Sequence, residues 1–316
     1  MHMVAVGGSD AGISAALRAR EVDPAAEVTV VAADAYPNFS ICGIPYYVSG
    51  EVSRWQNLAH RTSADLEATG MRLRLDTTAR RIDVTGRKLL VTGPGGAEEL
   101  ISYDQLVIGT GAVPVRPPIT GLTGPGALGT ADGVHLPHSM GDTFALMQTL
   151  EQASPGRAVI VGAGYIGLEM ADALTTRGLA VTQMEQLPEV LPTVDPGLGA
   201  LVHAELAARG VEVLTGTTVQ AISEAPAGRD GRLLVEAVTG TGEPLTRLAD
   251  LVLVVVGVRP DTDLAVLHPS AGQPVGRDPD RRPGLDPPGP SQMTLPAEDG
   301  DDATPAPSPA VPQTPP

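Results

Sequence analysis

Cys42 is the only cysteine in this chain of 316 residues. It lies in the segment of residues 35–47, and Pro45 has the fixed backbone angle that suits the first turn of a helix. The thiol is therefore predicted just before a helix N-terminus, where the partial positive charge favours the thiolate. One interpretation is a nucleophilic, redox-active thiol. The alternative is that Cys42 is a small buried hydrophobic residue, as free cysteine often is.

A glycine-rich segment at residues 158–169 carries the strongest binding signal. A β-rich run is followed by Gly162, Gly164 and Gly167 at the spacing of a dinucleotide-binding loop, and then by a helical pattern. Glu185 ends the next predicted strand, where a carboxylate can accept hydrogen bonds from both hydroxyls of an adenosine ribose. The same carboxylate would repel a 2′-phosphate, so this unit predicts a preference for NADH over NADPH.

A similar unit opens the chain at residues 4–16. Gly7 permits a tight turn, Gly12 permits close helix packing, and the helix N-terminus offers N–H groups to a pyrophosphate. Ser9 stands at the second glycine position, and Ala32 stands where an acidic residue usually holds a ribose. Asp34 is a candidate substitute for that acid. The alternative is a surface aspartate that starts a loop.

Composition restricts the possible partners and the compartment. Hydrophobic residues make up 42% of the chain, which is enough for sizeable cores, and the net charge of -16 argues against nucleic acid or an anionic membrane as partner. The longest apolar run, residues 251–256, has the length of a buried strand and cannot span a bilayer. A single cysteine forms no internal disulfide, and no signal segment opens the chain, so a cytoplasmic protein is expected. No metal site is predicted.

The segments between the two glycine-rich units read as mixed α/β structure. A helix is expected over residues 55–70 with a capped start near residues 61–63, and residues 71–75, 81–84 and 88–92 read as a meander of short strands. A buried strand near residues 103–108 runs into a Gly-Thr-Gly-Ala turn, which is expected to bring its backbone into a close approach; the alternative is an ordinary tight turn.

Together these segments resemble the single-cysteine branch of the FAD-dependent pyridine nucleotide-disulfide oxidoreductases, which includes coenzyme A-disulfide reductases and NADH oxidases or peroxidases. Five motifs carry the resemblance in colinear order, at residues 7–16, 40–47, 109–111, 162–169 and 256–260. The resemblance implies an α/β fold with two Rossmann-like dinucleotide-binding domains. It also implies FAD on the first unit and NAD(P)H on the second.

The resemblance also implies a domain order. Residues 1–118 are expected to form the first part of an FAD-binding domain, residues 119–244 an NAD(H)-binding domain, and residues 245–268 an incomplete return to the FAD domain. The family then has an aspartate motif for the ribityl chain and a dimerisation domain, so the family's homodimer is not expected through that domain here. Residues 269–316 instead hold fourteen prolines, no aromatic residue and an acidic run, which predicts a disordered tail.

Site roles follow from the resemblance. Cys42 is the expected redox-active thiol, Tyr165 is expected to gate the nicotinamide pocket, and Glu169 is expected near the flavin. For Tyr165 the alternative is a core aromatic residue, and for Glu169 a carboxylate on a helix surface. The predicted cofactor-binding residues are Gly7, Gly8, Ser9, Gly12, Asp34, Thr110, Gly111, Gly162, Gly164, Tyr165, Ile166, Gly167, Glu185 and Gly257.

The single sulfur limits the chemistry. With no second cysteine, Cys42 must cycle through a mixed disulfide with a small thiol or through a sulfenic acid, while the nicotinamide passes hydride to FAD and the flavin reduces the sulfur. The first expected substrate is a small disulfide or persulfide such as coenzyme A disulfide, and the second is oxygen or peroxide. Asp10 stands where the oxidases and peroxidases often have a histidine, and Ile41 stands where some coenzyme A reductases have an asparagine. Both substrate classes therefore stay open. A nicotinamide-binding remnant without turnover and an interaction protein acting through its tail also stay open.

Overall fold

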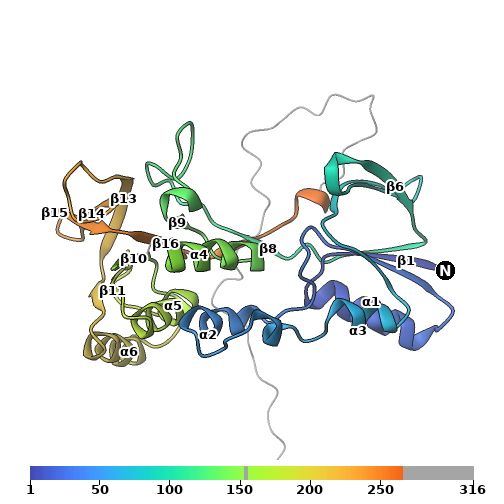
Figure 1. The fold of residues 1–316 in the computed structure, drawn as a ribbon, viewed down its shortest axis with the longest axis horizontal. Coiled ribbons are helices and arrows are strands. Elements are labelled where there is room, and N and C mark those ends of the chain that lie inside the picture. Colours follow the sequence, from blue (N-terminus) through green and yellow to red (C-terminus); the bar gives the residue numbers. More distant parts are fainter. Residues whose placement is uncertain (153–155, 266–316) are drawn as a thin grey trace, which may run out of the picture. The chain divides into compact units, whose positions relative to one another are not determined.

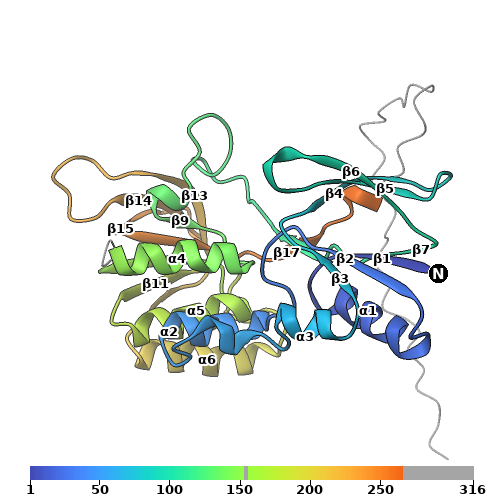
Figure 2. The same ribbon diagram turned by 45° about the vertical axis from the view of Figure 1, so that its right-hand side comes forward.

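The computed structural model describes residues 1–152 and 156–265. The predicted disordered tail, residues 269–316, lies outside the described residues. The described chain contains two parallel sheets, each packed between helices on one face and a small antiparallel sheet on the other (Figures 1 and 2). This arrangement agrees with the expected mixed α/β fold.

Along the strands of the first half, successive side chains point to opposite faces of the sheet. Val4 and Val6 of β1 point to one face of the sheet and pack against the small sheet, while Met3 and Ala5 point to the other and pack against helices. The four-stranded parallel sheet has the order β3 (Arg72–Arg74), β2 (Glu27–Val31), β1 (His2–Val6), β7 (Gln105–Ile108). The covering elements are α1 (Asp10–Val22) and α3 (Ser63–Ala68) on one face, and β4 (Thr78–Asp83), β5 (Lys88–Thr92) and β6 (Glu98–Ser102) on the other.

The second half repeats the plan with a larger sheet. Its strands bury both faces, because Ala158 and Ile160 pack against helices while Val159 and Val161 pack against an antiparallel sheet. The parallel order is β12 (Glu212–Leu214), β11 (Ala180–Met184), β10 (Arg157–Val161), β16 (Leu251–Val254), β9 (Val134–His135). The covering elements are α4 (Met140–Gln152), α5 (Tyr165–Thr176) and α6 (Pro196–Ala208), and on the other face β13 (Thr217–Glu224), β14 (Leu233–Thr239) and β15 (Pro244–Ala249).

Two segments cross between the halves. After the second half, the chain crosses back in strand β17 (Val258–Pro260), which pairs antiparallel with β8 (Ala112–Pro114). Helix α2 (Ile44–Ser49) lies between β2 and α3 of the first half in sequence but packs on α5 of the second (Figure 1). Its buried Ile44 and Val48 belong to the same apolar cluster as Met147 of α4 and Met170 of α5. The short 3-10 turns complete the described chain at Ile41–Gly43, Trp55–Leu58, Pro94–Gly96, Thr130–Asp132 and Asp263–Ala265.

Three sequence expectations are wrong in detail. The return to the first half does not begin at residue 245, because β15 completes the antiparallel sheet and β16 pairs parallel with β10; the return starts at β17. Residues 71–75 do not join the meander, because β3 extends the first parallel sheet beside β2. The helix expected over residues 55–70 is interrupted, because Thr62 starts a new helix with a capping box to Asp65.

None of the helices described is both long enough and apolar enough to cross a bilayer.

His135 predicts a pH dependence of stability. The residue is fully buried; its Nε2 lies 3.0 Å from the Thr149 hydroxyl, which donates to the Ala145 carbonyl, and its Nδ1 has no partner among the described residues. Burial lowers the pKa of His135 from 6.5 to about 4, and Asp142 opposes that shift only in part. Between pH 6.5 and 4 the unfolded chain therefore binds a proton here that the folded chain does not.

Lowering the pH through this window should reduce the free energy of unfolding by up to about 3 kcal/mol through His135 alone. Urea unfolding of wild type and His135→Leu at pH 7 and pH 4.5 checks this. The His135→Leu variant should lose clearly less stability between the two pH values, since the other titrating groups are shared. An equal loss in both proteins would show that His135 does not contribute.

Candidate functional site

The first glycine loop joins β1 to α1 and has no room for side chains at its two key glycines. Gly7 has a φ of +118°, and a Cβ there would lie 1.9 Å from the Gly109 carbonyl oxygen. A Cβ on Gly12 would lie 2.1 Å from the Gly7 carbonyl oxygen, so α1 starts directly against the loop. The turn after β7 therefore lies directly against the first glycine loop.

Thr110 and Gly111 hold the returning segment. The Thr110 hydroxyl donates to the Asp261 carbonyl at 2.5 Å, and the Asp261 N–H donates to the Gly111 carbonyl at 2.9 Å. Gly257, with a φ of +107°, precedes β17 and accepts a hydrogen bond from the Val115 N–H. These hydrogen bonds fix the crossing of β17, and the contact of Thr110, Gly111 and Gly257 with a cofactor stays a prediction.

Asn38 is a residue that the sequence analysis missed. It is buried, has a φ of +54°, and its N–H donates to the Gly8 carbonyl at 2.7 Å. Its side chain donates to Asp10 at 3.4 Å and accepts from Arg61 at 3.5 Å. A polar chain thus runs from the start of α1 to Arg61. The only available signal was that asparagine tolerates positive φ better than other residues with a Cβ.

The first glycine loop lacks a carboxylate at the end of its second strand, where one usually binds the ribose. Ala32 is buried at the end of β2, where a Cβ built on Gly8 would lie 2.8 Å from its methyl group. Asp34 follows; its Oδ1 accepts a hydrogen bond from the Tyr36 N–H, as in a loop-starting turn. Burial raises the pKa of Asp34, while that hydrogen bond opposes the rise. Its role as a ribose ligand stays a prediction.

Cys42 is exposed, which rules out the alternative of a buried hydrophobic residue. It lies in the 3-10 turn Ile41–Gly43 that leads into α2, with Pro45 in the first turn of that helix as predicted. The turn is closed by the Gly43 N–H, which donates to the Ser40 carbonyl at 3.1 Å. A Cβ on Gly43 would lie 2.6 Å from Leu58, so the turn rests directly on the residues that follow α2.

The second glycine loop repeats the geometry of the first. Gly162 has a φ of +105°, and a Cβ there would lie 2.7 Å from the Val255 carbonyl oxygen. Gly164, at φ −77° and ψ −174°, has nearly the backbone of Ser9 in the first loop, at φ −94° and ψ −168°. A Cβ on Gly167 would lie 2.3 Å from the Gly162 carbonyl oxygen. Both loops therefore present a helix N-terminus in the same way.

Glu185 stands directly after β11 and is only 7% exposed. One carboxylate oxygen accepts the Ala163 N–H at 2.7 Å, and the other accepts the Leu187 N–H at 2.9 Å. The two hydrogen bonds hold the carboxylate against the second loop. Because a carboxylate has about four acceptor sites, it can still accept from ribose hydroxyls.

The first turn of α5 carries the remaining predicted residues. Tyr165 is 60% exposed, so it is not a core aromatic residue, and its hydroxyl lies 3.5 Å from that of Thr193. Ile166 is exposed beside it. Glu169 lies one turn later and is also exposed; partial desolvation raises its pKa. The gating role of Tyr165 and the place of Glu169 near a flavin stay predictions.

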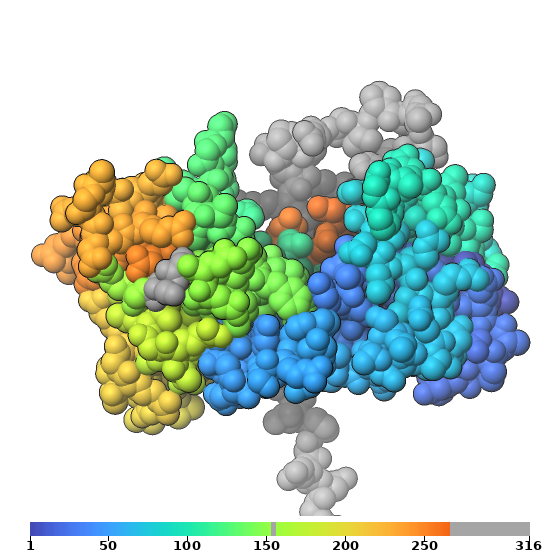
Figure 3. Space-filling model, in the orientation of Figure 1, coloured from blue at the N-terminus to red at the C-terminus, as the bar shows by residue number. Residues whose placement is uncertain are grey.

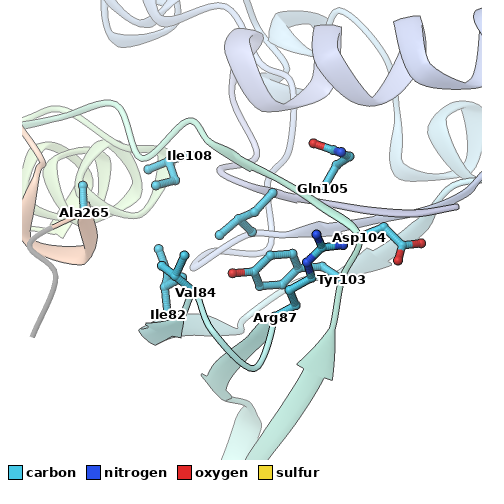
Figure 4. A pocket seen from close by; sticks show the side chains of 9 residues that line it. Ile82, Val84, Arg87, Tyr103, Asp104, Gln105, Ile108 and Ala265 are labelled. Carbon is cyan, nitrogen blue, oxygen red and sulfur yellow. The ribbon is translucent and has the colours of Figure 1, made fainter. Parts of the chain in front are cut away.

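A cavity of about 360 Å³ lies elsewhere in the first half, beside the outer edge of β7 (Figure 4). None of its lining residues belongs to the two glycine loops or to the Cys42 turn. Those residues are Ile82, Val84, Arg87, Tyr103, Asp104, Gln105, Leu106, Ile108 and Ala265. The cavity is therefore separate from the candidate site.

Alanine substitutions at two glycines of the second loop should affect stability differently. Gly164→Ala should leave the free energy of unfolding within about 0.5 kcal/mol, because no atom lies within 4 Å of its Cβ position. The same methyl group would occupy the space before the α5 N-terminus, so NADH should bind about tenfold more weakly. Gly167→Ala should instead destabilise the fold by about 1–3 kcal/mol.

Urea unfolding and NADH titration of both variants check this pair. Unchanged NADH affinity in folded Gly164→Ala would contradict the loop's assignment as the nucleotide site.

The residues present fit a dinucleotide at both loops. Each loop has a glycine at positive φ, a tightly packed third glycine, and a helix N-terminus whose N–H groups can bind a pyrophosphate. The second loop adds the fixed carboxylate of Glu185, whereas the first offers only Asp34. The fit is therefore complete at the second loop and partial at the first.

Comparison with known proteins agrees with this arrangement. An NADH oxidase of Methanocaldococcus jannaschii is 30% identical over 267 residues, covering 84% of this chain and 56% of the relative. An NAD(P)H sulfur oxidoreductase (CoA-dependent) of Pyrococcus furiosus is 31% identical over 264 residues, covering 83% and 55%. The structure of an NAD-dependent persulfide reductase from A. fulgidus has a TM-score of 0.73 and 35% identity, covering 84% of this chain and 47% of that one.

This chain spans about half the length of the relatives it matches. The sequence profile of the family described as pyridine nucleotide-disulphide oxidoreductase matches residues 1–281. The family and the α/β fold predicted from the sequence are confirmed, and FAD and NAD(P)H are the cofactors that this membership implies. The chain belongs to the pyridine nucleotide-disulphide oxidoreductase family.

Proposed function

We propose that this protein is an NADH- and FAD-dependent oxidoreductase that reduces a small disulfide or persulfide, such as coenzyme A disulfide, through Cys42. The single observation that carries the proposal is the setting of the only thiol. Cys42 is exposed in the turn before α2, and α2 packs on α5, the helix that starts at the second glycine loop. The sulfur is thereby linked to the candidate nucleotide site.

The chemistry at Cys42 is a thiol–disulfide exchange. The Cys42 thiolate attacks one sulfur of coenzyme A disulfide, the S–S bond breaks, and one coenzyme A leaves as a thiolate. The resulting mixed disulfide takes two electrons that come from NADH, and the second coenzyme A leaves. NADH, one proton and coenzyme A disulfide thus give NAD⁺ and two molecules of coenzyme A.

The chain's own residues bind and orient the reactants. The N-terminus of α5 and Glu185 would hold NADH, and the N-terminus of α1 with Gly7 and Gly12 would hold FAD. FAD, when bound, supplies the relay that accepts hydride and delivers two electrons to the sulfur. Cys42 supplies the nucleophile, and the protein is proposed to work in the cytoplasm, where thiols stay reduced.

The test is thiol release from coenzyme A disulfide by the FAD-loaded protein with NADH, measured without oxygen. Release that needs both NADH and the protein supports the proposal. NADH binding with no thiol release would instead indicate a nicotinamide-binding protein without turnover.

A second candidate is an NADH oxidase or peroxidase that works through a Cys42 sulfenate. The similarity to the Methanocaldococcus NADH oxidase favours it, and an exposed thiol is open to peroxide. Oxygen or peroxide consumption with NADH, in the absence of any disulfide, separates this activity from disulfide reduction.

Flavin retention should be weak in this chain. The first loop keeps its pyrophosphate-binding geometry, but Ala32 supplies no carboxylate for the ribose. We expect less than one FAD per chain after gel filtration, measured by absorbance, and a further loss in Asp34→Asn if Asp34 is the substitute ligand. Stoichiometric FAD in both proteins would show that neither position matters.

A further inference from the structure

Helix α2 carries the Cys42 turn at its start, yet its packing partners come from the second half. Ile44 and Val48 are buried in the cluster formed with α4, α5 and the second parallel sheet. In the space-filling view the blue surface of this segment lies directly against the green surface of α4 and α5 (Figure 3). The position of the thiol therefore depends on residues of the second half, which carries the second glycine loop.

Arg177 makes the one polar contact from α5 to this helix that the described residues contain. It is the C-cap residue of α5, and its Nε donates to the Val48 carbonyl, one of the last carbonyls of α2. Its Nη2 lies 3.6 Å from the Met147 sulfur of α4. A single guanidinium thus joins α5, α4 and the C-terminal end of α2.

An aromatic cluster ties the residues that flank the segment to α4. Tyr36, Trp55 and Phe144 pack edge to face, with ring centroids 5.1 to 5.6 Å apart. Tyr36 precedes the Cys42 turn, Trp55 follows α2, and Phe144 belongs to α4. With both flanks of the segment fixed, Arg177 restrains α2 itself, a helix of only six residues that is too short to be stable alone.

We propose that Arg177 is a positioning residue for Cys42. Helix α5 begins at the second glycine loop and ends at Arg177, so one rigid element connects the nucleotide site to the helix behind the thiol. The proposal rests on the proposed function for its effect on turnover. The predicted effect on the reactivity of the Cys42 thiol does not depend on the proposed function.

The test compares Arg177→Met with Arg209→Met. Arg209 is a matched control, because it is the C-cap residue of α6 but, among the described residues, its side chain pairs with Asp172 and Glu205 and not with α2. The probe is a chromogenic aryl disulfide, whose reaction reports Cys42 alone because the chain has no other cysteine. Coenzyme A disulfide reduction, NADH affinity and thermal unfolding are measured on the same samples.

Loss of Arg177 should let α2 and the turn before it fluctuate, so Cys42 should react at least threefold faster with the aryl disulfide. Turnover of coenzyme A disulfide should fall about tenfold while NADH affinity stays unchanged, because the sulfur loses its orientation. Arg177→Lys should restore part of both values, and Arg209→Met should match wild type. Wild-type thermal unfolding and NADH affinity, together with partial rescue by Arg177→Lys, would separate this effect from a general loss of structure.

Folded Arg177→Met with wild-type thiol reactivity would overturn the proposal. If Arg177→Met does not fold, Arg177→Leu, which keeps an apolar side chain but has no hydrogen-bond donor for the Val48 carbonyl, should give the same results. If wild type reduces no disulfide, the proposed function fails, and the aryl disulfide rates still decide the role of Arg177.

Discussion

Cys42→Ser should lower NADH-dependent reduction of coenzyme A disulfide by about three orders of magnitude or more, because it removes the nucleophile itself. Serine can neither form the mixed disulfide nor be oxidised to a sulfenate. Bleaching of bound FAD by NADH, followed in stopped flow, should stay near the wild-type rate, since Cys42 does not contribute to either glycine loop. The two half-reactions should therefore separate.

Ser40→Ala is a matched control for this substitution. It changes a hydroxyl in the same turn, while the backbone hydrogen bonds of Ser40 to Leu58 and Gly43 are kept. Turnover of this variant should remain within a few-fold of wild type. Wild-type disulfide turnover in Cys42→Ser would exclude the thiol mechanism. Equal inactivity of wild type and variant, with NADH still bound by both, would favour a nicotinamide-binding protein without turnover.

NADPH should bind at least tens-fold more weakly than NADH, an effect on the order of 2 kcal/mol. Glu185 is nearly buried, and two backbone N–H groups hold its carboxylate at the second loop, so it cannot swing away from an added phosphate. Titration of the protein with each nucleotide measures the ratio. Equal or tighter binding of NADPH would show that Glu185 does not face the ribose.

Glu185→Ser should shift this ratio at least tenfold toward NADPH, because it removes the negative charge and keeps a hydroxyl acceptor. Glu212→Gln is the control. Glu212 is a carboxylate on the neighbouring strand β12, but it is half-exposed and paired with Arg247 and Thr182. Its loss should leave the nucleotide ratio unchanged. A similar shift in both variants would point to the general charge of the protein instead of the fixed carboxylate.

Sequence patterns predicted the parts of the site that local chemistry dictates. Gly7, Gly12, Gly162 and Gly167 stand where a side chain would strike the backbone, so the sequence must place glycine there. Pro45 marked the start of α2, and the Thr62 capping box marked the start of α3. Such signals lie within a few residues of the structure they specify.

Non-local packing could not be predicted in the same way. Residues 71–75 have a strand pattern, but only tertiary structure decides whether the strand pairs with β2 or with the meander. The contact of Arg177 with Val48 joins residues 129 positions apart, and no spacing in the sequence indicates it. The boundary placed at residue 245 was wrong for the same reason, because β16 closes the second sheet before the chain crosses back.

The most direct test of electron transfer to Cys42 is an anaerobic NADH titration of FAD-loaded protein that has first been treated with coenzyme A disulfide and then freed of the excess disulfide. Each NADH carries two electrons, and the Cys42 mixed disulfide and FAD each accept two. Wild type should therefore consume two NADH per flavin before the flavin absorbance is fully bleached, and Cys42→Ser should consume one. Consumption of one NADH per flavin by both proteins would contradict the account.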